Sequence, residues 1–251
     1  MSDLPEPIPA ATLVLARESA NRPPEYLMME RAGHMAFAAG ALVFPGGRID
    51  EEDRRLGALS PEFEDGAARI AAIRETIEET GIAPALLPPP NPAAIDALRA
   101  GIERGEPFDR LLGEQGLTLA LDALVPFARW CPNFREARRF DTCFFLAEAP
   151  PEAAPPSVNA HEAVRAFWAS AAEVLAELHA GRAKAIFPTR RNLERLAGFG
   201  SIAEARADAA RHPVAKITPW VEKREGELRV CIPEGIGYPV TSEALETARR
   251  R

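Results

Sequence analysis

The stretch Arg74-Glu75-Thr76-Ile77-Glu78-Glu79-Thr80-Gly81-Ile82 carries the most informative pattern in the sequence. A helix turns by about 100° per residue and would gather its three glutamates on one arc of roughly 100°. The opposite face would be apolar, with Ile70, Ile73 and Ile77. Like charges three and four residues apart repel by a few tenths of a kcal/mol, so stability alone does not favour this arrangement. The pattern predicts an amphipathic helix whose acidic face is either solvated or binds a hard cation such as Mg²⁺ or Mn²⁺.

A glycine pair lies upstream, within Phe44-Pro45-Gly46-Gly47-Arg48-Ile49-Asp50. The two segments together resemble the signature of the Nudix hydrolase family. That signature reads G, five residues, E, seven residues and then R-E-U-x-E-E-x-G-U, where U is aliphatic. Gly47 matches the opening glycine. The fixed positions of the second half are all matched, by Arg74, Glu75, Ile77, Glu78, Glu79, Gly81 and Ile82.

The signature is interrupted in its middle. Gly47 and Arg74 lie 27 positions apart, against 14 in the regular signature, so 13 residues are inserted. The first glutamate of the signature would fall at Asp53 when counted forward and at Gly66 when counted back. Neither residue is a glutamate, so the role of the signature's first glutamate stays unassigned. Two nearby carboxylates could substitute for it, Glu64 and Asp65.

The inserted region, residues 50–65, is acidic and has no sustained apolar period, so we expect a surface excursion beside the active-site mouth. An interrupted signature resembles the branch of the family that includes a peroxisomal coenzyme A diphosphatase. Residues 26–31, 37–47 and 139–145 also resemble that branch, and the resemblance extends over about residues 10–200. The C-terminal sequence lacks a peroxisomal address of the SKL type, which favours a cytoplasmic protein.

The resemblance implies an α/β fold, the Nudix α/β/α sandwich with a curved mixed sheet, in which the signature forms a loop–helix–loop. We expect a Nudix hydrolase domain over residues 8–195, with the signature at 47–82 and a helical insertion at about 84–117. Residues 196–251 are expected to form a C-terminal extension that contains a helix and a hairpin.

Local patterns give the same succession of elements. Apolar runs bounded by turn residues predict strands at 11–16, 26–29, 41–44, 140–147 and 163–168, and one long strand at 118–130. Cap and stop residues predict helices at 67–80, 92–101, 170–181 and 201–213. The tail at 216–232 is typical of a hairpin. Strands interleaved with helices are typical of α/β or α+β proteins.

The family resemblance also implies a reaction and its residues. Nudix hydrolases cleave a nucleoside diphosphate linked to another group by attack of water on phosphorus. By this resemblance Glu75 and Glu79 are metal ligands, and Glu78 either completes the metal shell or takes the proton of the water. Arg74 is expected to orient a carboxylate through a forked hydrogen bond. A further ligand often comes from a distant loop, and Glu162, which precedes Trp168, is the candidate, with an ordinary loop acid as the alternative.

Substrate contacts are expected from a glycine turn and from arginines. Gly46 and Gly47 would let backbone approach the metal and the start of the helix. Arginines near predicted strand ends could bind phosphate or simply be solvated, namely Arg31, Arg138 and Arg139. Three aromatic residues could stack on a base, although core packing is favoured for them: Trp130, Phe134 and Trp168. The two G-x-G patterns, at 198–200 and 235–237, are more typical of turns than of phosphate loops.

Composition excludes several classes of protein. A formal charge of −7 argues against a general nucleic-acid binder, which needs a basic face. No apolar run reaches the ~18 residues that a membrane span requires. The three cysteines form no C-x-x-C pair for zinc or redox chemistry. We therefore expect a cytoplasmic enzyme acting on a small nucleoside-diphosphate substrate, without nucleic-acid or membrane partners. The sequence does not fix the oligomeric state, although the C-terminal hairpin could pair across the axis of a homodimer.

Three functions remain open from the sequence. The first is a metal-dependent coenzyme A or acyl-coenzyme A diphosphatase that uses Mg²⁺ or Mn²⁺. The second is hydrolysis of ADP-ribose or of a dinucleotide such as NADH. The third, of another class, is a non-catalytic Nudix module that senses a nucleotide. The intact R-E-x-x-E-E run argues against the sensor, because a sensor has no need to keep carboxylates that repel one another.

Overall fold

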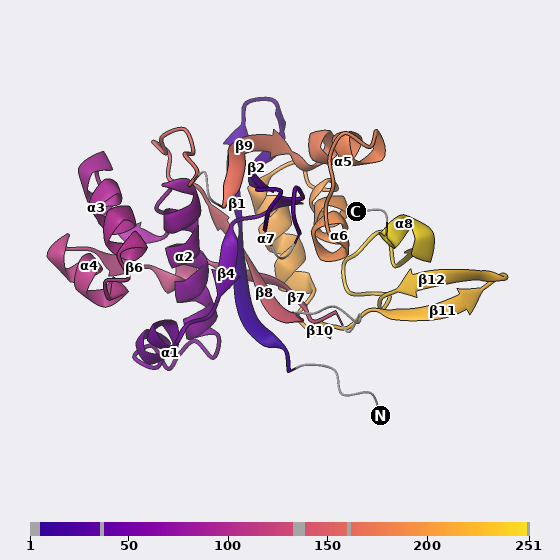
Figure 1. The fold of residues 1–251 in the computed structure, drawn as a ribbon, viewed down its shortest axis with the longest axis horizontal. Coiled ribbons are helices and arrows are strands. Elements are labelled where there is room, and N and C mark those ends of the chain that lie inside the picture. The colour runs from indigo at the N-terminus through magenta and orange to yellow at the C-terminus, as the bar shows by residue number, and fades with distance from the viewer. Residues whose placement is uncertain (1–5, 36–37, 133–138, 160–161, 250–251) are drawn as a thin grey trace.

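The computed structural model describes residues 6–35, 38–132, 139–159 and 162–249, and a large mixed sheet lies at their centre (Figure 1). Its strands are β1 (Ile8–Ser19), β2 (Arg22–Arg31), β3 (Leu42–Val43), β4 (Gly46–Arg48), β7 (Val125–Trp130), β8 (Phe140–Glu148), β9 (Ala163–Ser170) and β10 (Lys216–Ile217). Within the described residues the strand order is β10-β7-β8-β1-β2-β3, with β4 paired to β1 and β9 paired to β2.

Strand β1 is the centre of the sheet. It runs parallel to β8 along one edge, where Ile8 faces Phe140 and Ala16 faces Glu148. Along its other edge it pairs antiparallel first with β4 and then with β2. Side chains alternate between the two faces of a strand, and here both faces are covered. This double burial explains the nearly continuous apolar run of β1.

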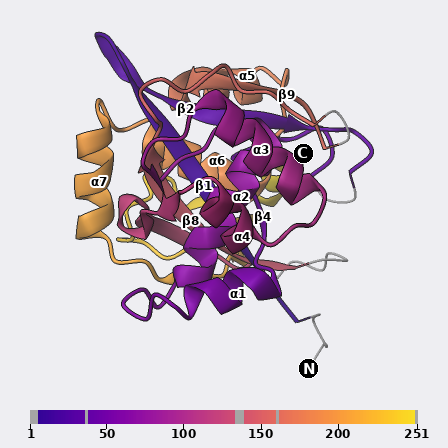
Figure 2. The ribbon, with the colours of Figure 1, turned by 90° about the vertical axis from the view of Figure 1, so that its left-hand side faces the viewer.

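Helices cover both faces of the sheet, as Figures 1 and 2 show. One face packs against α2 (Gly66–Thr80), α3 (Pro92–Glu103) and α4 (Phe108–Glu114) through a core that includes Leu13 and Phe145. The other face packs against α5 (Ala171–His179), α6 (Phe187–Leu196) and α7 (Ile202–Arg211) through a core that includes Val14 and Phe144. The predicted α/β/α layering is therefore confirmed.

Two local expectations are wrong. The 13-residue insertion is more than a surface excursion, because it begins with helix α1 (Glu51–Gly57), which packs on α2 and buries Asp53 and Leu56. The approach is close: a Cβ on Gly57 would lie 2.4 Å from the nitrogen of Ala67. The predicted long strand at 118–130 is broken into β6 (Thr118–Leu119), the 3₁₀ helix η1 (Leu121–Ala123) and β7. Strand β6 turns away to pair with β5 (Leu86–Leu87).

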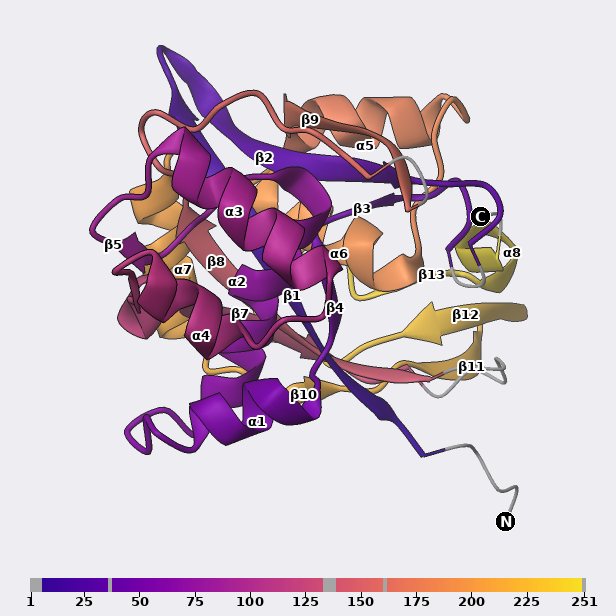
Figure 3. The same ribbon diagram turned by 60° about the vertical axis from the view of Figure 1, so that its left-hand side comes forward.

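The C-terminal region divides between the main sheet and a small second sheet (Figure 3). Strand β10 joins the main sheet beside β7, and Ile202 of α7 packs in its core. The remaining residues form β11 (Trp220–Arg224), β12 (Glu227–Cys231), β13 (Ser242–Ala244) and α8 (Leu245–Arg249). A domain boundary at residue 195 stays a prediction. In the described parts of the chain, no helix combines the length and the apolar character needed to span a membrane.

Candidate active site

Helix α2 presents the predicted acidic face. It ends at Gly81, whose left-handed backbone (φ 66°) accommodates the turn that stops the helix. Ile70, Ile73 and Ile77 are buried on the sheet side of the helix. The carboxylates of Glu75 and Glu79 enter the main pocket of the protein, whereas Glu78 lies outside its lining.

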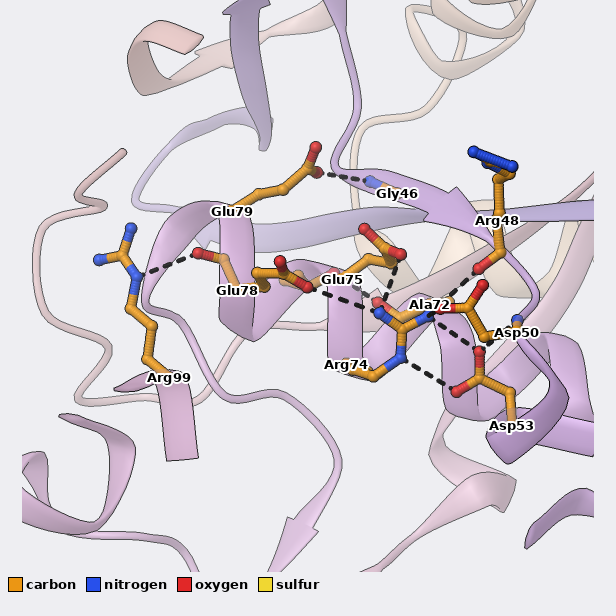
Figure 4. A network of polar contacts seen from close by, with 11 residues as sticks. Gly46, Arg48, Asp50, Asp53, Ala72, Arg74, Glu75, Glu78, Glu79 and Arg99 are labelled. Carbon is orange, nitrogen blue, oxygen red and sulfur yellow. Dashed lines mark hydrogen bonds and ion pairs between the residues drawn. The ribbon is translucent and has the colours of Figure 1, made fainter. Parts of the chain in front are cut away.

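Strand β4 brings a glycine pair against these carboxylates (Figure 4). The Gly46 N–H donates a hydrogen bond to Glu79 Oε2 at 2.8 Å. A Cβ on Gly46 would lie 2.3 Å from the Ala11 carbonyl oxygen, and one on Gly47 would lie 2.3 Å from Glu75 Cδ. Both are overlaps that real Cβ atoms do not show, so a side chain at either position would displace the backbone or the carboxylate. The two glycines are required by the packing of β4 on β1 and α2.

Arg74 contacts the acidic face of α2 without lining the pocket. Its Nη2 lies 2.9 Å from Asp53 Oδ2, and its Nε donates to Asp53 Oδ1 at 3.1 Å. Its Nη1 lies 2.9 Å from Glu75 Oε1 and 3.5 Å from Glu78 Oε2. Arg74 thus ties α1 to the acidic face of α2 through a forked pair with Asp53.

Asp53 occupies the position reached by counting forward from Gly47, and its side chain is completely buried. The structure does not bring the other two candidates to this cluster. Asp65 pairs with Arg69 at 2.6 Å at the start of α2, and Glu64 lines a separate pocket beside it. Sequence spacing contained the signal for Asp53, but the insertion made the count ambiguous.

Burial and mutual repulsion shift the pKa values of the glutamates upward. Burial raises the pKa of Glu75 to about 7, with Arg74 opposing the shift and Glu78 adding to it. Burial, and then the charge of Glu75, raises the pKa of Glu79 well above its ordinary value. Burial also raises the pKa of Glu78, where Glu162 contributes repulsion. Burial is thus the largest cause of all three shifts, with repulsion inside the cluster adding to it, and carboxyl groups with such raised pKa values are common at functional sites.

The carboxylates of the pocket are suitable ligands for a hard divalent cation, but in this structure they do not converge on one position. Glu75, Glu79 and Glu162 line the pocket, and carboxylate oxygens are the ligands that Mg²⁺ and Mn²⁺ prefer. Across the described residues, no three carboxylate, imidazole or thiol groups converge into a coordination cluster. Arg74 accounts for part of this, because it holds the Glu75 carboxylate and lies close to that of Glu78. Arg74 pairs with Oε1 of Glu75 and Oε2 of Glu78, which leaves the other oxygen of each carboxylate for a cation.

The pocket has a volume of about 580 Å³ and continues from the acidic end across the sheet. Cations line it through Arg31 and Arg139, and the buried Nε atoms of both have no hydrogen-bond partner among the described residues. Arg138 and Phe134, which the sequence suggested as phosphate- and base-binding candidates, lie outside the described residues. Trp168 does not line the pocket; it packs on Arg17, whose guanidinium lies 4.6 Å from the ring centre.

The far end of the pocket is aromatic and was not predicted as a binding wall. It is formed by side chains from β3–β4, β7, β8 and the start of α6, including Phe44, Trp130, Phe140, Phe144 and Phe187. Helix α6 carried little signal, since its sequence FPTRRNLERL places arginines on a buried face. For Trp130 the sequence favoured core packing over stacking on a base, and the residue is both buried and part of this wall.

Arg99 of α3 is a further residue that the sequence did not single out. Its Nε donates to the carbonyl oxygen of Glu78 at 3.0 Å (Figure 4), and its Nη1 donates to Ser157 Oγ at 2.6 Å. It therefore connects the helical insertion to the last turn of α2 and to the loop before Glu162.

Comparisons with known proteins agree with this geometry. No family model matches the chain. Nudix hydrolase 7 of Caenorhabditis elegans is 30% identical over 69% of this chain, and the chain spans about half (55%) of that protein. Human acyl-coenzyme A diphosphatase NUDT19 is 29% identical over 78% of this chain and 70% of its own length.

Among solved structures, a Nudix hydrolase from Alicyclobacillus acidocaldarius superposes with a TM-score of 0.72. It is 28% identical, and the match covers 82% of this chain and 97% of that one. With the signature residues placed on α2 and β4 of this fold, the chain belongs to the Nudix hydrolase superfamily, and within it resembles the acyl-coenzyme A diphosphatase NUDT19.

Proposed function

We propose that the protein is a metal-dependent diphosphatase that hydrolyses a nucleoside diphosphate linked to another group, with coenzyme A or acyl-coenzyme A as its substrate. The observation that carries this proposal is the polarity of the pocket. Four carboxylates, Asp50, Glu75, Glu79 and Glu162, line the same cavity as three arginines, Arg31, Arg48 and Arg139. A diphosphate brings negative charge that suits the arginines, and it brings a bound cation that suits the carboxylates.

The chain's own residues divide the work as follows. Glu75 and Glu79 would hold Mg²⁺ or Mn²⁺, with Glu162 entering from the loop before β9. A cation held there would supply charge to neutralise the diphosphate and would lower the pKa of the attacking water. Glu78 either joins these ligands or accepts the proton of the water. Arg74 orients Glu75, because its other side is fixed by the fully buried Asp53.

The substrate is held by backbone and by arginine. Gly46 and Gly47 line the pocket and let the β4 backbone lie against Glu79 and Glu75, since neither position admits a side chain. Arg31 and Arg139 each offer a buried, unpartnered Nε to an incoming anion. The cavity of about 580 Å³ lies within the usual range for small-molecule sites, ~300–1,000 Å³. The human relative is named for acyl-coenzyme A, and this supports coenzyme A ahead of shorter nucleotides.

A substrate panel tests the proposal. Coenzyme A, acyl-coenzyme A, ADP-ribose, NADH and diadenosine polyphosphates would be incubated with Mg²⁺ or Mn²⁺, and products identified by mass. We expect coenzyme A substrates to be cleaved fastest, yielding 3′,5′-ADP and a 4′-phosphopantetheine product. Faster cleavage of ADP-ribose or NADH would move the assignment to the dinucleotide class. Tight nucleotide binding without cleavage of any compound would instead support a sensor.

A second comparison tests the 3′-phosphate of coenzyme A. If Arg31 or Arg139 binds it, replacing that residue by alanine should raise KM for coenzyme A more than for dephospho-coenzyme A. Equal turnover of both compounds, unchanged in both variants, would contradict a dedicated 3′-phosphate site. The cytoplasmic location, the homodimer and the absence of nucleic-acid partners remain predictions from the sequence.

A further inference from the structure

The C-terminal region reaches the substrate pocket through a buried tyrosine. Tyr238 does not line the pocket, but it packs directly behind Trp130, which does. The two rings meet edge to face, with centroids 5.5 Å apart and an interplanar angle of 84°. On its other side Trp130 meets Phe187, also edge to face, at 5.9 Å and 83°. Trp130 is thus held between a ring of the pocket wall and a ring of the C-terminal region.

A hydrogen-bonded triangle fixes the indole more narrowly than ring packing does. Trp130 Nε1 donates to the Tyr238 hydroxyl at 3.1 Å, and that hydroxyl donates to Asn192 Oδ1 at 2.7 Å. The direct contact from Trp130 Nε1 to Asn192 Oδ1 is long, at 3.4 Å. Because the contact at 3.1 Å is the shorter of the two, the Tyr238 hydroxyl is the main partner of the indole N–H, and all three residues are buried. A buried donor that loses its partner is costly, and the side chain then moves to find another.

The loop before Tyr238 has a backbone conformation that places this residue beside Trp130. Gly235 and Gly237 both have positive φ, of 74° and 88°, which is the turn conformation expected from this G-x-G pattern. A Cβ on Gly237 would lie 3.0 Å from Arg195 Nε. Arg195 belongs to α6, whose first turn also lines the pocket. The turn therefore brings Tyr238 into contact with α6 and β7 together.

We propose that Tyr238 is a positioning residue, which sets the orientation of Trp130 and so the affinity of the pocket for the nucleotide part of the substrate. The position of Trp130 supports this assignment. Along the sheet, Trp130 faces Thr142, Thr142 faces Ala10, and Ala10 faces Arg48 of the glycine strand. One row of residues thus joins the aromatic wall to the acidic end. A flat base bound over this row would lie against a wall whose shape depends on the orientation of Trp130, a ring that is 1% exposed. The proposal rests on the diphosphatase function for its kinetic readout.

The test compares the two tyrosines of the chain. Tyr238→Phe removes the hydroxyl that Trp130 uses and keeps the ring. Tyr26→Phe is the matched control, because Tyr26 is equally buried and its hydroxyl has no partner among the described residues. With the best substrate of the panel, Tyr238→Phe should raise KM by about 3- to 10-fold and leave kcat nearly unchanged, as expected for one lost hydrogen bond. Tyr26→Phe should change neither constant.

A second readout requires no turnover. In a Trp168→Phe/Trp220→Phe background, Trp130 is the remaining tryptophan, and its fluorescence reports its surroundings. Tyr238→Phe should shift this emission and weaken its quenching by added ADP, while Tyr26→Phe should do neither. In a Trp130→Phe background, Tyr238→Phe should no longer raise KM, since the two residues act as a unit.

The outcomes separate this proposal from the proposed function. If no compound is hydrolysed but ADP quenching still depends on Tyr238, the diphosphatase function fails and the positioning role stands. Unchanged KM, emission and ADP quenching in Tyr238→Phe would overturn the positioning role. So would a rise in KM of the same size in the Trp130→Phe background.

Discussion

Two helices of this molecule bury arginine among carboxylates, but the ratio of arginines to carboxylates differs between them. On α2, the single guanidinium of Arg74 lies 2.9–3.6 Å from four carboxylates, and Glu79 is buried beyond them. On α6, three arginines face three carboxylates: Arg190, Arg191 and Arg195 face Glu194, Glu243 and Asp208. Each α6 arginine thus has a carboxylate available, whereas the cluster around Arg74 has more carboxylates than arginines.

The comparison shows that charge balance, more than a shifted pKa, separates a functional cluster from a structural one. Burial raises the pKa of Glu75 on α2 and of Glu194 on α6, each to about 7. In the α6 cluster the pairs connect helix α6 to β13 and α7, and they need no further ion. In the α2 cluster the repulsion is uncompensated, and a stability-driven sequence would not retain it unless it served chemistry.

The largest expected effect comes from removing one excess charge on α2. Glu79→Gln keeps size and polarity but loses a metal-binding charge. We expect kcat to fall at least ~100-fold, on the order of 3 kcal/mol of barrier. The folded state should not be weakened, because the variant relieves repulsion from Glu75. Glu194→Gln on α6 is the matched control, and steady-state kinetics should show its kcat nearly unchanged.

Melting curves with and without Mg²⁺ complete this test. The cation should raise Tm of the parent and of Glu194→Gln, and it should raise Tm of Glu79→Gln much less, because a ligand stabilises only the state that binds it. Retention of more than half the activity by Glu79→Gln would contradict its assignment as a metal ligand.

The next effect comes from the carboxylate that anchors each arginine. Asp53→Asn leaves Arg74 buried without its forked partner and should lower the free energy of unfolding by about 3 kcal/mol. Asp208→Asn should have a similar cost, because Arg195 loses contacts of 2.8 and 2.9 Å. Only Asp53→Asn should also lower kcat, since Arg74 then no longer orients Glu75. Urea unfolding and kinetics on the same samples would distinguish the two, and equal kcat in both variants would remove the proposed role of Asp53.

The smallest effect is on the pH dependence of stability. A carboxyl group whose pKa is raised in the folded state stabilises the fold at low pH, and that contribution is lost as pH rises from its ordinary value of 4.5 to about 7. For Glu194, whose side chain is 14% exposed, we expect a loss of about 2 kcal/mol over this window. Glu194→Gln should remove this part of the decline in urea unfolding. Added Mg²⁺ should instead offset the decline in stability that comes from Glu75. The distinction between the clusters would be contradicted if Mg²⁺ changed the contributions of Glu75 and Glu194 to this decline equally.

Helix α2 and its acidic face could be predicted because their signature is local. The spacing of Glu75, Glu78 and Glu79 fixes their shared face, and Gly81 fixes the end of the helix. Asp53 could not be assigned, because the 13 inserted residues separate two counts that agree in an uninterrupted signature. The aromatic wall was missed for a different reason. Trp130 and Phe187 are brought together by the sheet and by α6, and no local period reveals such a contact.

The same limit explains the wrong strand at 118–130. Residues 118–119 pair with Leu86 and Leu87, more than thirty positions earlier, and this distant partner decides where the apolar run breaks. Pairing of this kind depends on the assembled fold and is not encoded in the run itself.

The parallel pairing of β1 with β8 also governs the order in which the chain can assemble. Ile8 pairs with Phe140, 132 positions later, so the central strand leaves the ribosome long before its main partner exists. At ~5–20 residues per second this interval is roughly 7 to 26 s. During it the apolar residues Leu13, Val14 and Leu15, which are fully buried in the finished sheet, are without β8. The apolar face of β1 therefore stays without its parallel partner during this interval, and the carboxylates of α2 are translated before the sheet beside them can close.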